Sequence, residues 1–217
     1  MIQYEDYNPD AKLLVNSLTT EYQWLPLLKG RNKPYEILLD YLHNLGVKSN
    51  LGTENYDNKE FQSNRIAEIT GIKVSKIKGW LTKIYNDILE LNYDEPELFN
   101  NGCLYHYVLY FNYHSYFYED FNVWLPTILN RFDRFEFNFI EAKLNTRSFW
   151  VKDISHTYKN GKATTQIELK GGFSNVYREL LFEKAIYMRK ISSLSKFKLY
   201  DFQMDEILME YAKKEKL

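Results

Sequence analysis

One basic stretch of this 217-residue chain lies between residues 63 and 83. The stretch carries a net charge of +4, whereas residues 1–62 sum to −3 and residues 84–100 to −5. The whole chain has a net charge of only −1, so an anionic partner must be met by a local patch. Lysine and arginine neutralise the phosphate oxygens of nucleic acids. The charged residues of the stretch are Arg65, Lys73, Lys76, Lys78 and Lys83, opposed only by Glu68.

The same stretch has the pattern of two helices joined by a glycine turn. Ala67 is small enough for two helices to cross closely, and Gly71 can adopt the left-handed conformation that ends a helix. The pattern predicts one helix over about 61–70 and a second over about 74–91. Apolar residues that would be buried against a preceding helix are Ile66, Ile72, Ile77 and Trp80.

Residues 63–82 therefore resemble the helix-turn-helix motif of bacterial DNA-binding proteins. The resemblance implies double-stranded DNA as the partner, with the start of the second helix at the groove. Ser75 could cap that helix or contact phosphate, and no Arg, Asn or Gln stands near the start to read base edges. One short motif makes few contacts, so a homodimer on two half-sites is expected. The predicted DNA-binding residues are Ser63, Asn64, Arg65, Lys73, Ser75, Lys76, Lys78 and Lys83.

Two other interpretations of the motif stay open. The glycine could join two ordinary helices of a bundle, with the lysines only solvating one face. The protein could also be an interaction or assembly module without DNA binding, whose contact surface is the aromatic second half. The leading hypothesis is a transcriptional regulator, or an accessory protein of a phage or mobile element, whose effector the sequence does not reveal.

Catalytic signatures are weak. Glu141-Ala142-Lys143 at a predicted strand end, with Asp133 upstream, is similar to the Glu-x-Lys arrangement of metal-dependent nucleases. A second Glu-x-Lys at Glu168 shows how easily the pattern arises, so solvated strand-edge charges are the preferred interpretation. We expect no enzyme, no catalytic residues and no cofactor.

Histidines offer the remaining candidate for metal chemistry. His106 and His114 share strand parity, and His156 lies in another predicted strand. No spacing among them demands a metal, which needs about three ligands at close range. We expect ordinary sheet histidines and no metal site.

Apolar residues at helical spacing predict two helices before the motif. The first follows Asp10, a candidate cap, and ends at Pro26, because proline has no N–H and restricts the residue before it. The second extends from Pro34 to about Leu45 and stops at Gly46. Residues 47–60 are polar and predict a long loop.

Beyond a linker over 93–102, the apolar period changes from helical to two. Alternation predicts strands around 105–113, 135–139, 147–158 and 162–169. Asn160-Gly161 favours a tight hairpin between the last two. Four or five antiparallel strands are expected.

The predicted fold class is α+β. A helical helix-turn-helix domain covers residues 1–99, to which 84–111 could add a wing. A small antiparallel sheet or barrel domain covers 100–217, with two C-terminal helices, one capped by Ser174 and one over about 199–214.

Composition narrows the class of protein further. Aromatic residues make up 17% of the chain, and packing in a core or an oligomer is the expected use. The single Cys103 excludes an intramolecular disulfide, and the N-terminus has no basic flank or apolar run. The uncharged stretch 98–118 is too polar for lipid. These features predict a cytoplasmic protein with no membrane partner.

Overall fold

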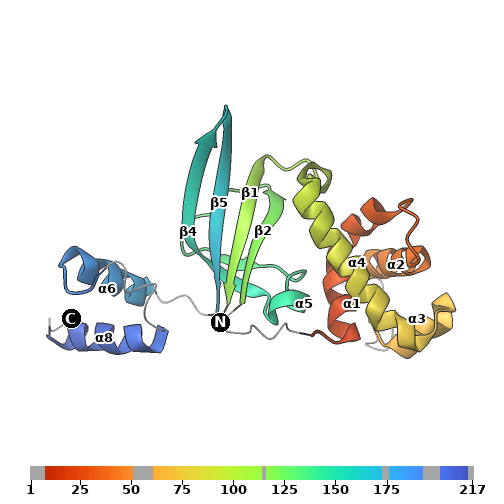
Figure 1. The fold of residues 1–217 in the computed structure, drawn as a ribbon, viewed down its shortest axis with the longest axis horizontal. Helices are drawn as coiled ribbons and strands as arrows, with labels where there is room; N and C mark the ends of the chain where they lie inside the picture. The colour runs from red at the N-terminus through yellow and green to blue at the C-terminus, as the bar shows by residue number, and fades with distance from the viewer. Residues whose placement is uncertain (1–7, 51–60, 114–115, 173–175, 193–200, 215–217) are drawn as a thin grey trace. The chain divides into compact units, whose positions relative to one another are not determined.

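The computed structural model describes residues 8–50, 61–113, 116–172, 176–192 and 201–214 (Figure 1). The chain is a mixed α+β protein with a five-stranded sheet and helices at both ends. It divides into two compact units, Met1–Gly172 and Phe173–Leu217. These units differ from the predicted domains 1–99 and 100–217, because the helices before residue 100 and the sheet after it share one hydrophobic core.

The N-terminal helices are α1 (Ala11–Thr20), η1 (Tyr22–Leu28) and α2 (Glu36–Asn50). Asp10 caps α1, since its Oδ1 accepts a hydrogen bond from the Leu13 backbone N–H at 2.7 Å. The predicted end at Pro26 is wrong for the α-helix, which stops at Thr20; Pro26 lies inside the 3₁₀ helix η1.

Gly46 does not end α2, contrary to the sequence-based expectation. The helix continues to Asn50, and Gly46 is buried. A Cβ at this position would lie 2.3 Å from Tyr22 Cβ and 2.6 Å from the carbonyl oxygen of Thr19. The glycine therefore lets α2 approach the α1–η1 segment closely, and contact rather than termination explains it.

The predicted motif helices are present as α3 (Ser63–Thr70) and α4 (Val74–Asp94), followed by η2 (Pro96–Phe99). Residues 84–111 form no wing, because α4 and η2 occupy most of that stretch before the first strand begins. Of the predicted loop 47–60, residues 47–50 belong to α2 and the rest lie outside the described residues.

The strands are β1 (Tyr105–Tyr113), β2 (Tyr116–Leu125), β3 (Arg134–Glu136), β4 (Ser148–Lys159) and β5 (Lys162–Gly171), in the order β2-β1-β5-β4-β3. The β4–β5 hairpin is confirmed, with Asn160 at φ 54° and Gly161 at φ 80°. The all-antiparallel expectation is wrong: β1 and β5 pair in parallel, from Tyr107 opposite Thr165 onward. Alternation of apolar residues reports which face of a strand is buried and not which way its neighbour runs.

Aromatic residues fill the core where the helices meet the sheet. The Trp24 ring lies 5.2 Å from the Phe139 ring and 5.4 Å from the Phe99 ring, centroid to centroid. Phe121 and Phe137 also contact Trp24. Core packing is thus confirmed as the use of these aromatic residues.

The second unit contains α6 (Val176–Tyr187) and α8 (Asp201–Lys214). These correspond to the two predicted C-terminal helices, although the predicted cap Ser174 lies outside the described residues. Their own apolar cluster includes Leu181, Phe182, Ala185, Met204 and Leu208. Among the described helices, none is both long and apolar enough to cross a membrane.

Candidate nucleic-acid interface

A three-residue turn joins α3 to α4. Gly71 adopts the left-handed conformation, φ 71°, and its N–H donates to the carbonyl oxygen of Ala67 at 2.9 Å. Ile72 is buried beneath the turn, and Lys73 is the N-cap of α4. The positive φ explains why a glycine stands here, since a side chain would be strained in that conformation.

Apolar contacts hold both helices against the rest of the first unit. Ile66 of α3 and Ile77 of α4 are completely buried, while Ala67 and Trp80 are partly buried against the same core. Further along α4, the hydroxyl of Tyr85 donates to the Phe139 carbonyl oxygen at 3.0 Å. The orientation of α4 is therefore fixed by burial along one side.

The side of the α4 N-terminal end away from Ile77 is free of this packing. Lys73, Ser75, Lys76 and Lys78 are all exposed. Figure 1 shows α4 extending from α3 at one end toward the sheet at the other, so its lysine-bearing start lies away from the sheet. Within the described residues of the first unit, the sheet does not cover this end of the helix.

Helical geometry divides the exposed surface of α4 into a midline and two flanks. Each residue turns the helix by about 100°, so positions 75, 79, 82 and 86 fall along one line of the helix surface, away from the buried Ile77 and Leu81. The midline consists of small or polar residues, the exposed Ser75, Gly79 and Asn86 and the half-buried Thr82. Lys76 and Lys83 lie along one flank and Lys78 along the other.

This midline admits close approach of another molecule. A Cβ built on Gly79 has no neighbouring atom within 4 Å. Thr82 directs its hydroxyl back to the Lys78 carbonyl oxygen at 3.0 Å, which keeps it close to the helix. Asn86 is exposed and was missed by the sequence reasoning, although extending the helical periodicity by one turn would have found it.

Several predicted contact residues already have partners within the chain. Arg65 pairs with Glu68 at 2.7 Å, and Lys78 Nζ donates to Asn8 Oδ1 at 2.9 Å. The Lys76 ammonium lies 5.8 Å from the centre of the Trp80 ring. Exposed pairs of this kind are weak, about 0–1 kcal/mol, so a phosphate can replace them.

Two other lysines make no such contact. Within the described residues, neither Lys73 nor Lys83 forms a hydrogen bond or an ion pair. As the N-cap, Lys73 makes no side-chain capping bond. Ser75 is not the cap, because α4 begins at Val74 and places Ser75 in the first turn. Its hydroxyl and the backbone N–H groups of that turn suit an anion.

The residues predicted on α3 lie in its first turn. Ser63 is half-buried at the first position, whereas Asn64 and Arg65 are exposed. Contact between DNA and this turn stays a prediction.

The nuclease-like residues are not arranged as expected. Glu141 and Lys143 lie in the short helix α5 (Glu141–Leu144) and not at a strand end. Asp133 accepts a hydrogen bond from the Asn130 N–H at 2.7 Å, as in a local turn, and Glu168 pairs with Lys152. The Glu-x-Lys interpretation at residues 141–143 therefore loses its structural premise.

The histidines make ordinary polar contacts. His106 Nε2 lies 3.0 Å from Asn122 Oδ1, and His156 Nδ1 lies 3.0 Å from Thr165 Oγ1. His114 lies outside the described residues. Across the described ranges, no three His, Cys, Asp or Glu side chains form a group that could hold a metal ion.

No protein-family model, curated protein or solved structure matches this chain at a significant level. Its function must be inferred from the residues themselves.

Proposed function

We propose that this chain is a DNA-binding protein, a transcriptional regulator or an accessory protein of a phage or mobile element, in which the start of α4 enters the major groove. One observation carries the proposal: a small, polar midline on the exposed side of α4 is flanked on both sides by lysines. A helix lying in the major groove meets base edges along its midline and phosphates along its flanks.

Charge and burial support this assignment together. Residues 63–83 carry a net charge of +4, while the stretches on either side of them, residues 1–62 and 84–100, are acidic. Acidic neighbours repel the duplex elsewhere and so favour approach at the start of α4. The lysines contact phosphate without reading sequence, so the affinity of one protomer is mainly electrostatic.

Discrimination between DNA bases then depends on a few side chains of α4. Ser75, Thr82 and Asn86 are the midline side chains with hydrogen-bonding atoms. Two copies of the chain, with the midlines of their α4 helices one helical turn of DNA apart, about 34 Å, would double the contacts. We therefore propose a homodimer on paired half-sites.

A salt titration of a double variant tests the proposal. Lys76→Ala with Lys78→Ala removes one lysine from each flank. The slope of log K against log salt for a random duplex should become shallower by about 1.8, since each phosphate contact contributes about 0.9. Fluorescence anisotropy at several sodium chloride concentrations measures this slope.

The matched control removes two exposed lysines elsewhere, Lys159→Ala with Lys184→Ala. It changes the net charge equally and should leave the slope nearly unchanged. Equal effects of both double variants would mean that general charge, and not α4, attracts the duplex.

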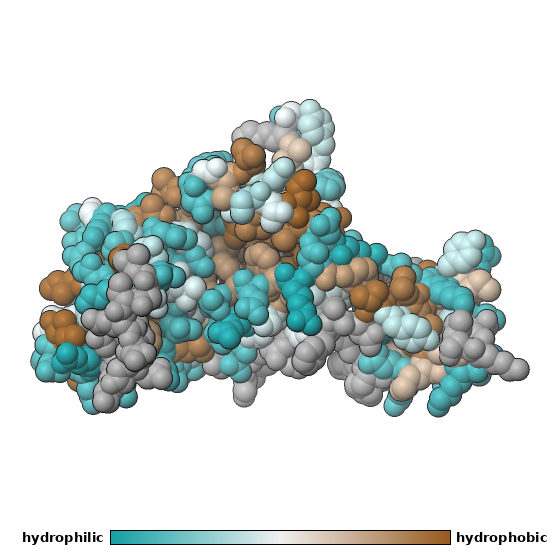
Figure 2. Space-filling model, turned by 180° about the vertical axis from the view of Figure 1, so that it is seen from behind, coloured by the Kyte–Doolittle hydropathy of each residue, from teal (hydrophilic) through white to brown (hydrophobic). Residues whose placement is uncertain are grey.

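A second candidate function, assembly with another protein, is favoured by one apolar region of the sheet unit. Leu104 is 84% exposed and Ile128 is 56% exposed, and both line a cavity of about 450 Å³. Figure 2 shows apolar residues gathered in the middle of the view, where the sheet lies. Exposed apolar patches commonly mark protein contacts.

Light scattering tests this assembly function. The native chain should have twice its mass of 26.1 kDa if a second copy covers the region. Leu104→Ser with Ile128→Ser should then give a monomer. An unchanged mass for the variant would exclude these residues from the contact.

A further inference from the structure

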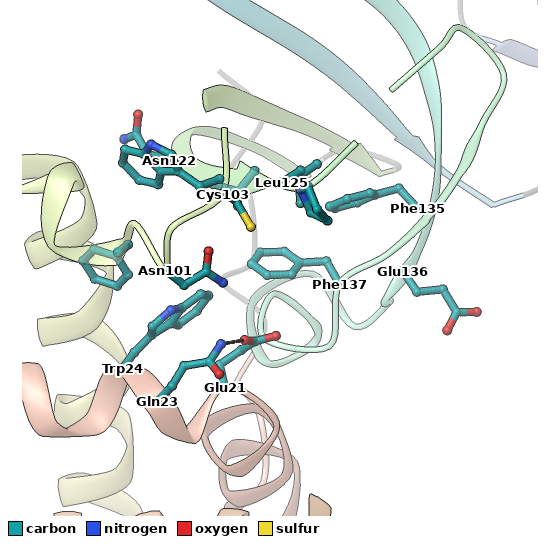
Figure 3. A pocket seen from close by; sticks show the side chains of 14 residues that line it. Glu21, Gln23, Trp24, Asn101, Cys103, Asn122, Leu125, Phe135, Glu136 and Phe137 are labelled. Carbon is teal, nitrogen blue, oxygen red and sulfur yellow. Dashed lines mark hydrogen bonds between the residues drawn. The ribbon is translucent and has the colours of Figure 1, made fainter. Parts of the chain in front are cut away.

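A cavity of about 370 Å³ opens in the first compact unit, at the side of the sheet where η1 meets β2 and β3. Figure 3 shows its lining, with the Asn101 amide between Trp24 and Phe137. Small-molecule sites typically have about 300–1,000 Å³ and apolar walls with a few polar groups. The size and lining of this cavity match that description.

Glu21 supplies the cavity with a carboxyl group that lacks a cationic partner. Its Oε2 accepts a hydrogen bond from Gln23 Nε2 at 3.1 Å (Figure 3). In the part of the chain that the structure describes, Glu21 forms no ion pair. Burial raises the pKa of this carboxyl from 4.5 to about 7. A partly desolvated carboxylate without a counter-ion is costly, and a bound cation would remove that cost.

The rest of the lining adds no positive charge. None of the described residues around the cavity is Lys, Arg or His. The other acidic residue of the lining is Glu136, whose side chain points away from the labelled group in Figure 3. The field inside the cavity therefore favours a cation and disfavours an anion.

We propose that this cavity binds a small organic cation, an ammonium or guanidinium compound with a flat apolar body, through the Glu21 carboxylate. The amide oxygens of Gln23 and Asn101 accept the remaining N–H groups. The rings of Trp24 and Phe137 contact the apolar body and attract the charge through their π faces. A metal ion fits less well, because no three metal-ligating side chains are grouped among the described residues.

Calorimetry with 2-phenylethylammonium and 3-phenylpropionate, an anion with the same phenylethyl body, tests the proposal on the full chain at pH 8. The cation should bind and the anion should bind at least tenfold more weakly. Glu21→Gln should lower the affinity for the cation at least tenfold. Glu90→Gln, an exposed carboxyl of α4 outside the cavity, should leave its affinity unchanged.

Three outcomes would overturn the proposal. They are absence of cation binding at millimolar concentration, equal binding of cation and anion, and unchanged cation affinity in Glu21→Gln. Glu21→Gln removes a desolvated charge and should fold, and its unfolding curve checks this directly.

The pH dependence of cation binding provides a second test of the role of Glu21. With a pKa of about 7, Glu21 is only about 3% ionised at pH 5.5, so the cation should bind about thirtyfold more weakly there. Three other side chains with ionisable groups lie nearby: Cys103 and Glu136 in the cavity lining, and His106, which contacts Asn122 of the lining. Glu21→Gln keeps all three, so a pH dependence that persists in this variant would also contradict the proposal.

The proposal is independent of DNA binding, and its failure is distinguishable from a failure of that function. Glu21→Gln should bind random duplex like the native chain. Lys76→Ala with Lys78→Ala should bind 2-phenylethylammonium like the native chain.

Discussion

Glu21 should make the stability of the protein depend on pH in an unusual direction. A carboxyl whose folded pKa is raised takes up a proton on folding between the two pKa values. Its contribution is therefore most favourable below about pH 4.5 and is lost as the pH rises through about 7. Most carboxyls of folded proteins are paired or hydrogen-bonded and act in the opposite direction.

The size of this contribution to the free energy of unfolding follows from the pKa shift of Glu21. The pKa rises from 4.5 to about 7, and each unit corresponds to about 1.4 kcal/mol, which sets an upper value of about 3 kcal/mol. The side chain is only partly buried, so solvent screening reduces this value. Replacing Glu21 by Gln should remove this cost. The free energy of unfolding of the variant should therefore exceed that of the native chain, by about 1 kcal/mol at pH 5 and by up to about 3 kcal/mol at pH 8.

Urea unfolding of both proteins, followed by tryptophan fluorescence at pH 5 and pH 8, measures the gain. Comparing the variant with the native chain at each pH cancels the contributions of all other titrating groups. Glu90→Gln, an exposed carboxyl, is the control and should show a change below about 0.5 kcal/mol. If the free-energy difference between Glu21→Gln and the native chain is the same at both pH values, Glu21 is not desolvated and the reasoning is refuted.

Three further substitutions test the packing by chemical denaturation. Gly46→Ala should destabilise the protein by about 1–3 kcal/mol, because its Cβ would lie 2.3 Å from Tyr22 Cβ; no loss would mean that α2 and η1 separate easily. Gly79→Ala should stabilise it by about 1 kcal/mol, since the added Cβ meets no atom within 4 Å. Asn92→Ala should cost about 2–4 kcal/mol, because Asn92 bonds the buried backbone N–H and C=O of Asn122; a cost below about 1 kcal/mol would show that water replaces it.

Local signals in the sequence predicted local structure well. Gly71 and Asn160-Gly161 need positive φ angles, and the structure has them at these positions. The helices on either side of Gly71 and the β4–β5 hairpin follow from such signals together with apolar periodicity.

Long-range arrangement was beyond the sequence patterns. The parallel pairing of β1 with β5 depends on how the chain crosses over between them, which alternation does not encode. The sequence predicts a helix end at Gly46, because a glycine that ends a helix and a glycine that admits a close neighbour cannot be told apart by sequence. The boundary near residue 100 was based on the change of period, yet the core is continuous across it.

The sequence proposes residues for the candidate site but does not show how they are arranged on α4. The lysines were identified by charge, but their division between two flanks of α4 requires the buried side of the helix to be known. Glu21 gave no signal, because its raised pKa arises from burial at the junction of α1 and η1.

Binding of the native chain to random duplex DNA at 50 and 200 mM sodium chloride tests the central claim most directly. Four lysines, Lys73 at the N-cap of α4 and Lys76, Lys78 and Lys83 in its first three turns, correspond to a slope of about −3.6 per protomer. The affinity should therefore fall about a hundredfold or more over this range. Absence of binding at 50 mM, or an affinity that salt leaves unchanged, would contradict the claim that this end of α4 contacts DNA.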